Sequence, residues 1–256
     1  MALNRLMNFP LLVFAISLVV LSLSAWIGTS FRKRRSLEED EREDFGVVLA
    51  ATLTLLGLII GFSFSMAISR YDQRKNYEEA EANAIGTEYV RTDLLPSPDA
   101  AKVNALLRKY LDQRILFYGT RDQHELLQIN DYTARLQTEL WSAVRIPASA
   151  QPTPVIALAV AGMNDVLNSQ GYTQAAWWNR IPFAAWVLMA AIAICCNLLI
   201  GYGARRPKQE AILFLVLPLV VSISFLLIAD IDSPRGGLIR VAPQNLVSLS
   251  QSLPGH

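Results

Sequence analysis

The sequence has few of the residues from which catalytic and metal centres are usually built. It contains only two histidines, His124 and His256, and two cysteines, Cys195 and Cys196, which are adjacent inside an apolar run. No metal-ligand spacing of Cys and His occurs, and the signatures of serine hydrolases, zinc peptidases and phosphate-binding loops are missing. We therefore expect no metal, no cofactor and no enzymatic activity.

Charged residues are also scarce. They make up 18% of the chain, whereas about a quarter is usual in soluble domains. The formal net charge is +1, which gives no indication of a nucleic-acid partner. Apolar residues make up 52% of the chain and are concentrated in four blocks, a pattern typical of a protein whose main partner is the lipid bilayer.

Each apolar block is long enough to cross a membrane, because about 20 helical residues cover the hydrocarbon core. The predicted spans are residues 9–27, 45–68, 182–202 and 211–229. None of them contains an ionisable Asp, Glu, Lys, Arg or His, which argues against a proton-coupled pump. We interpret the first block as a span rather than a cleaved signal peptide, because basic residues 32–35 follow it.

The segment between the second and third spans is predicted to be helical and exposed to water. Residues 69–94 continue the second span as one charged helix without a proline. Further helices are expected from a cap at Ser97 or Asp99 to residue 118, over 121–145 and over 154–167. No segment alternates like a strand, so the predicted fold class is an all-α membrane protein with four transmembrane helices and a helical extramembrane middle segment.

This pattern divides the chain into four parts. They are transmembrane hairpin 1 (residues 1–69), the helical extramembrane segment (70–181), transmembrane hairpin 2 (182–229) and a C-terminal tail (230–256). Basic residues are denser in the short connections, residues 30–44 and 203–210, than near the other span ends. The positive-inside rule therefore predicts that both connections lie in the cytoplasm.

Small residues recur at every fourth position of the second span. They are Gly57, Gly61, Ser65 and Ser69. Such a stripe either lets two helices pack closely or lines a narrow conduit, and from the residues alone packing is the favoured interpretation. Phe62 and Met66 flank the stripe one turn apart. They would form a hydrophobic constriction in a conduit and would otherwise be core residues.

Charged residues mark the end of the second span. Arg70 and Arg74 either anchor the helix at the lipid headgroups or surround the mouth of a conduit. Four glutamates follow, Glu78, Glu79, Glu81 and Glu88, and we interpret them as a solvated ion-pair face. After the fourth span, Asp230 and Asp232 provide too few oxygen ligands for a calcium site.

Two segments resemble a known family. Residues 44–89, DFGVVLAATLTLLGLIIGFSFSMAISRYDQRKNYEEAEANAIGTEY, are similar to the bacterial bestrophin-like domain, and residues 229–243, ADIDSPRGGLIRVAP, resemble its end. The layout of two spans, a helical middle, two spans and a tail is also similar. Bestrophins are pentameric anion channels whose second helix lines the pore. The resemblance therefore implies a homo-oligomer, a pentamer in that family, that conducts small inorganic ions.

On this resemblance, the second span supplies the pore. The pore-lining residues would be Gly57, Gly61, Phe62, Ser65, Met66 and Ser69, with Arg70 and Arg74 at the pore mouth. The alternative is a non-conducting membrane scaffold or stress sensor whose middle helices bind a partner. Both interpretations predict a multi-pass protein of the bacterial inner membrane.

The sequence departs from the family at two points. Bestrophins have an Asn-Pro-Phe-Gly turn followed by acidic residues that help to bind Ca²⁺. Residues 233–236 read Ser-Pro-Arg-Gly here, and the acidic residues precede them, so calcium gating is not implied. Bestrophins also keep the middle segment in the cytoplasm, which is opposite to the orientation predicted from charge.

Overall fold

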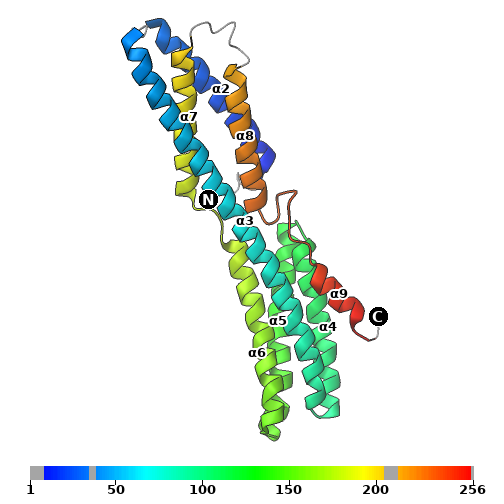
Figure 1. The fold of residues 1–256 in the computed structure, drawn as a ribbon. Coiled ribbons are helices and arrows are strands. Elements are labelled where there is room, and N and C mark those ends of the chain that lie inside the picture. The colour runs from blue at the N-terminus through cyan, green and yellow to red at the C-terminus, as the bar shows by residue number, and fades with distance from the viewer. Residues whose placement is uncertain (1–8, 35–38, 205–212, 255–256) are drawn as a thin grey trace. The chain divides into compact units, whose positions relative to one another are not determined.

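The computed structural model describes residues 9–34, 39–204 and 213–254, and these are mostly helical (Figure 1). The elements are α2 (Pro10–Arg34), α3 (Glu39–Arg91), the 3-10 turn η1 (Thr92–Leu94), α4 (Ser97–Gly119), α5 (Gln123–Ala150), α6 (Pro154–Trp178), α7 (Phe183–Gly203), α8 (Leu213–Asp232) and α9 (Gln244–Ser252). No strand occurs within the described ranges, and the predicted all-α class is confirmed.

Four stretches of the described chain are long and apolar enough to cross a membrane. They are Pro10–Arg32, Glu41–Leu94, Pro154–Gly203 and Phe214–Asp232. The prediction of four transmembrane helices is thereby confirmed. Residues 35–38 and 205–212 lie outside the described residues. Those two ranges include part of each short connection on which the orientation prediction rests, and the first two residues of the predicted fourth span.

The chain forms two compact units. The membrane unit comprises Met1–Arg70 and Arg180–Arg240, and the helical unit comprises Tyr71–Asn179 and Val241–His256. Helix α3 contributes its apolar half to the first and its charged half to the second. The segment predicted as one C-terminal tail is divided between the two units at residue 240.

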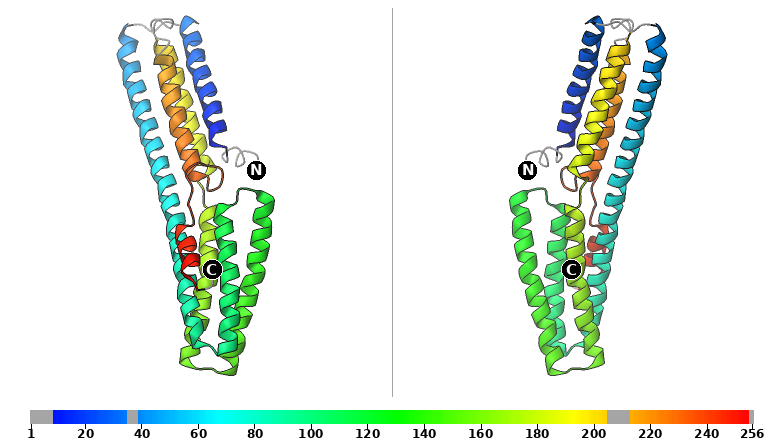
Figure 2. Two further views of the ribbon diagram at one scale, coloured as in Figure 1. Left: turned by 90° about the vertical axis from the view of Figure 1, so that its right-hand side faces the viewer. Right: turned by 90° about the vertical axis from the view of Figure 1, so that its left-hand side faces the viewer.

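In the membrane unit, α2 packs along α7 and α8 (Figure 2). Two glycines allow the closest approach of α2 to α7. A Cβ added to Gly201 would lie 1.9 Å from the Ala25 carbonyl oxygen, and one added to Gly28 would lie 2.2 Å from the Leu198 carbonyl oxygen. Only glycine fits such a backbone contact, so small-residue packing holds α2 and α7 together.

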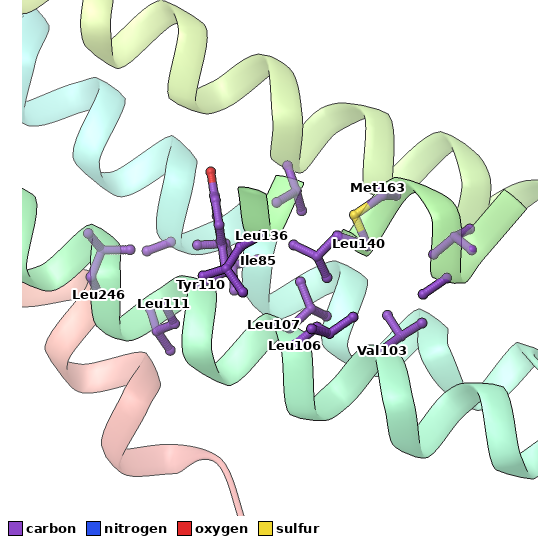
Figure 3. Close-up of a cluster of buried hydrophobic side chains, with 14 of the residues drawn as sticks. Ile85, Val103, Leu106, Leu107, Tyr110, Leu111, Leu136, Leu140, Met163 and Leu246 are labelled. Carbon is purple, nitrogen blue, oxygen red and sulfur yellow. The ribbon is translucent and has the colours of Figure 1, made fainter. Parts of the chain in front are cut away.

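In the helical unit, α4, α5, α6 and the charged half of α3 surround an apolar core (Figure 3). Ile85, Leu107, Tyr110, Leu140 and Met163 are fully buried in it. The core forms because apolar residues recur at helical spacing along each helix, so that every helix has one face to bury.

Two helix ends differ from the sequence-based expectation. Helix α5 was expected to end before Pro147, but it continues to Ala150, with the proline buried in its last turns. Helix α6 continues through Gly171 to Trp178 instead of ending near residue 167. Glycine in a helix costs about 1 kcal/mol relative to alanine. Burial of Thr173 and Trp177 beyond it offsets that cost.

Candidate functional site on helix α3

The apolar half of α3 is the least covered membrane segment of the chain. Only 6% of its most apolar stretch is buried, against 33%, 28% and 44% in the other three candidate spans. The other three spans therefore pack against their own chain over a larger share of their surface than the apolar half of α3 does. The apolar half of α3 therefore leaves most of its surface available to lipid or to other copies of the chain.

The stripe of small residues lies on this open surface. Gly57, Gly61, Ser65 and Ser69 are all exposed in the single chain. A Cβ added to Gly57 or Gly61 would meet no atom of the described residues within 4 Å. The stripe therefore does not serve helix packing inside the chain, unlike the glycine pair of α2 and α7. What remains for this face is contact with lipid, with other copies or with a conduit.

The opposite face of α3 is turned toward its own chain. Leu56, Ser63 and Ala67 are 2%, 3% and 0% exposed. Their spacing of seven and four residues places them on one side of the helix, about half a turn from the stripe. The apolar half of α3 thus has a covered face and an open face.

Phe62 and Met66 lie beside the open face. Their side chains are 61% and 39% exposed, so neither is a core residue of the single chain. Arg70 is half-buried at the end of the membrane unit. Arg74 is 1% exposed and lies on the covered side of α3, in register with Ala67 seven residues earlier. The stripe, Phe62 and Met66 thus share an open surface, whereas Arg74 does not.

A family model described as Bestrophin-like domain matches residues 14–246. The chain belongs to the bestrophin-like family. The resemblance noted in the sequence is thereby confirmed over nearly the whole chain. Among proteins with curated functions, none matches this sequence.

Solved structures of bacterial bestrophin homologues share this fold. One, a single-substitution variant from Klebsiella pneumoniae, is 13% identical, with 94% of this chain and 96% of that chain covered and a TM-score of 0.61. Another from Klebsiella pneumoniae, solved by zinc phasing, is 14% identical, with 95% and 99% covered and a TM-score of 0.60. At such low identity the similarity establishes the fold of this bestrophin-like chain as that of a multi-pass membrane protein.

Beyond residue 70, the covered face of α3 carries charges that the sequence analysis wrongly placed in solvent. Glu78, Glu81 and Glu88 are 1%, 0% and 0% exposed. A signal for this was present in the spacing. Arg74, Glu81 and Glu88 follow Ala67 at intervals of seven, and so continue the face that is covered in the apolar half.

Glu81 is the centre of a buried polar network in the helical unit. Its carboxylate pairs with the Arg114 guanidinium on α4, whose Nη2 lies 3.4 Å from Oε2. The hydroxyls of Tyr118 and Thr173 also donate to Oε2, at 3.3 and 3.2 Å. Arg114 further stacks 4.3 Å from the centre of the Phe117 ring. One carboxylate thus connects α3 with α4 and α6.

The protonation of this network follows from its charges. Burial alone would lower the pKa of Arg114, but the adjacent Glu81 carboxylate outweighs burial and raises that pKa. Burial and the same carboxylate together raise the pKa of Tyr118. The network therefore holds one compensated ion pair and a neutral phenol in the interior of the bundle.

Glu78 holds the C-terminal helix. Its Oε1 accepts hydrogen bonds from the backbone amides of Asn245 and Leu246, at 2.9 and 3.0 Å, and its Oε2 accepts one from Asn245 Nδ2 at 2.6 Å. These amides open α9, where the free N–H groups and the helix dipole favour a negative charge. Leu246 is completely buried. Glu78 therefore fixes the tail to α3 within the helical unit.

Asp230 and Asp232 also accept hydrogen bonds from backbone amides. Asp230 accepts hydrogen bonds from the amides of Leu238 and Ile239, both at 2.8 Å. Asp232 accepts one from the Ile181 amide at 3.0 Å. In the part of the chain that the structure describes, no group of three or more His, Cys, Asp or Glu is placed to hold a metal ion. The two carboxylates stabilise the turn after α8 and the entry to α7.

Proposed function

We propose that this bestrophin-like protein is an oligomeric ion channel in which the apolar half of α3 from several copies lines the pore. The observation that carries the proposal is the open face of α3. It places Gly57, Gly61, Ser65 and Ser69 on a surface that the described residues of the chain leave exposed. Small side chains at the axis of a ring of helices leave room for an ion, and family membership favours this use of the face.

Phe62 and Met66 would narrow such a pore. Their apolar side chains project from α3 without burial in the chain. A ring of such side chains gates by excluding water from a narrow passage. Arg70 at the end of the membrane unit would supply positive charge near one mouth, which favours anions. By analogy with bestrophins, the channel would be a pentamer in the bacterial inner membrane, with the helical unit in the cytoplasm.

Ion flux through purified protein in liposomes tests the proposal, with chloride and potassium gradients measured separately. We expect chloride flux that Gly61→Leu abolishes, because a ring of leucines would fill the pore at that level. Ala191→Leu is the matched control, since Ala191 is an exposed small residue of α7. The oligomeric state of each variant is checked by light scattering.

The outcomes separate the two candidate functions. Chloride flux that Gly61→Leu removes and Ala191→Leu leaves intact supports the channel with α3 at its pore. Flux that survives Gly61→Leu in an intact oligomer contradicts the assignment of α3. No flux of either ion from a folded oligomer contradicts the channel and favours the scaffold or sensor, with the helical unit as its partner-binding part.

Orientation is tested by labelling from one side of the membrane. In a background of Cys195→Ala and Cys196→Ala, Asp99→Cys places a single thiol at the start of α4. We expect a membrane-impermeant maleimide to label it only after the cells are opened. Labelling of intact spheroplasts would instead support the orientation predicted from the basic connections.

A further inference from the structure

Glu88 differs from the other buried carboxylates of α3 because no donor among the described residues forms a hydrogen bond to it. Its side chain is completely buried. Neither carboxylate oxygen has a hydrogen-bond partner among the described residues. An ionised carboxylate in such a place loses the hydration that it has in water and gains no hydrogen bond in return. The neutral carboxylic acid is therefore the favoured form.

The carboxyl occupies a niche that a glycine provides. A Cβ added to Gly162 of α6 would lie 2.0 Å from Oε2 of Glu88 and 2.7 Å from Nη1 of Arg91. The two side chains thus occupy the space that any larger residue would fill. Glycine is a poor helix former, so its place in the interior of α6 fits a requirement for this space.

The charged groups around the niche do not compensate a negative charge fully. Arg91, less than one turn along α3, lowers the pKa of Glu88, and Asp165 on α6 raises it. Arg108 on α4 already donates to the Tyr89 hydroxyl at 2.7 Å and to the Pro254 carbonyl. Helix α5 faces the core with apolar residues such as Leu140. Burial dominates, and the pKa of Glu88 rises to about 8.

We propose that Glu88 is a proton-binding site of the helical unit, occupied at neutral pH and emptied in mildly alkaline solution. Loss of the proton leaves an uncompensated charge between α3 and α6 and weakens their contact. The proton is taken up from solvent and returned to it, and no other reactant is needed. The proposal does not depend on whether the protein conducts ions.

The direction of the pH effect follows from proton linkage. The pKa of Glu88 is about 8 in the folded protein, whereas the ordinary value of a solvated glutamate, as in the unfolded chain, is 4.5. Between these two values the folded state holds one proton more than the unfolded state, so stability falls as the pH rises. Below the lower pKa and above the higher pKa, Glu88 does not make the free energy of unfolding depend on pH. The opposite sign would require a pKa lowered by folding.

Thermal unfolding of the full-length protein in detergent tests the site, at about pH 6 and about pH 9. We expect the wild-type melting temperature to drop by several degrees between them. Glu88→Gln imitates the protonated form and cannot lose a proton, so its melting temperature should exceed that of the wild type at the lower pH and by a larger margin at the higher pH. Glu79→Gln is the matched control, because Glu79 is exposed on the same helix and should follow the wild type.

Gly162→Ala provides a second test of the niche. Its methyl group would displace the carboxyl toward water, so the melting temperature should fall at the lower pH and its pH dependence should shrink. Two results would overturn the proposal. One is a Glu88→Gln protein with the same alkaline drop as the wild type. The other is a Glu88→Gln protein destabilised at both pH values, because a neutral isostere should fit the site.

Discussion

The two halves of α3 differ in which side chains are exposed and which are buried. The apolar half leaves Phe62 61% exposed, whereas the charged half buries Arg74 and Glu81 to 1% and 0%. Burial along this helix follows the face on which a residue lies and not its polarity. Leu56 and Ala67 begin a covered face that Arg74 and Glu81 continue.

The difference has a physical cause in the surroundings of each half. Leaving an apolar side chain exposed to lipid costs little free energy, because lipid tails are as apolar as leucine. A charge removed from water must instead find partners, as Glu81 does in Arg114. The helical unit is therefore stabilised by specific polar contacts inside one chain. The open face of α3 can acquire a role only from neighbouring copies or lipid.

The largest effect should come from breaking the buried ion pair of the charged half. Arg114→Ala leaves the Glu81 carboxylate buried without its counter-charge, which typically costs 3–5 kcal/mol, on the order of a domain's whole stability. Chemical denaturation followed by tryptophan fluorescence measures it. Arg121→Ala is the control, because Arg121 is exposed just beyond α4.

A paired replacement sharpens this prediction. Glu81→Leu combined with Arg114→Met removes both charges and should recover much of the stability lost in the single variant, since an apolar pair needs no compensation. If Arg114→Ala alone leaves the unfolding midpoint unchanged, the network does not hold the helical unit together. Both outcomes are independent of ion flux.

The sequence predicted the apolar half of α3 better than the charged half. Long uncharged runs leave few alternatives to a membrane span, so α2, α7 and α8 were also found. Charges at helical spacing are usually solvated, and this made the burial of Glu78, Glu81 and Glu88 hard to foresee. Helix α9 was missed because its nine residues depend on contacts with Glu78, far away in the sequence.

The glycines illustrate the same limit. Gly57 and Gly61 have the regular spacing of a packing motif, yet a Cβ added to either would meet no atom of the described residues within 4 Å. Gly28 and Gly201 make the close helix contact, yet they lie on different helices and form no pattern within either. A contact between two helices is a property of their arrangement, which spacing along one helix does not contain.

The second prediction compares these glycines directly. Gly201→Ala places a methyl group in the Ala25 carbonyl and should destabilise the membrane unit by roughly 1–3 kcal/mol, as overpacking does. The methyl group of Gly57→Ala would meet no atom of the part of the chain that the structure describes, so this substitution should not destabilise the fold. Melting temperatures in detergent distinguish the two variants. Equal losses would show that Gly57 is packed as closely as Gly201. A loss that vanishes when the oligomer dissociates would assign the Gly57 contact to another copy.

A smaller effect is expected at the tail. Glu78→Ala removes the acceptor of the first amides of α9, a loss that costs about 1 kcal/mol at helix N-termini. Hydrogen exchange of residues 245–250 should become faster while the core around Leu107 stays protected. Glu79→Ala, at the exposed neighbouring position, is the control. Unchanged exchange in Glu78→Ala would mean that the other contacts of the tail, such as the burial of Leu246, hold the helix in place without this carboxylate.

The smallest effect on stability should come from Phe62→Ala, because this side chain is mostly exposed and supports no core of the chain. Among substitutions on the apolar half of α3, it should have the clearest effect on ion flux. If Phe62 narrows a pore, its removal widens the passage, lets water in and raises chloride flux in liposomes. Val216→Ala, at an exposed position of α8, should leave flux unchanged.

Equal flux in wild type and Phe62→Ala, with the oligomer intact, would remove Phe62 from the conduit. The open face of α3 would then require a constriction at Met66 or a lining supplied by another helix.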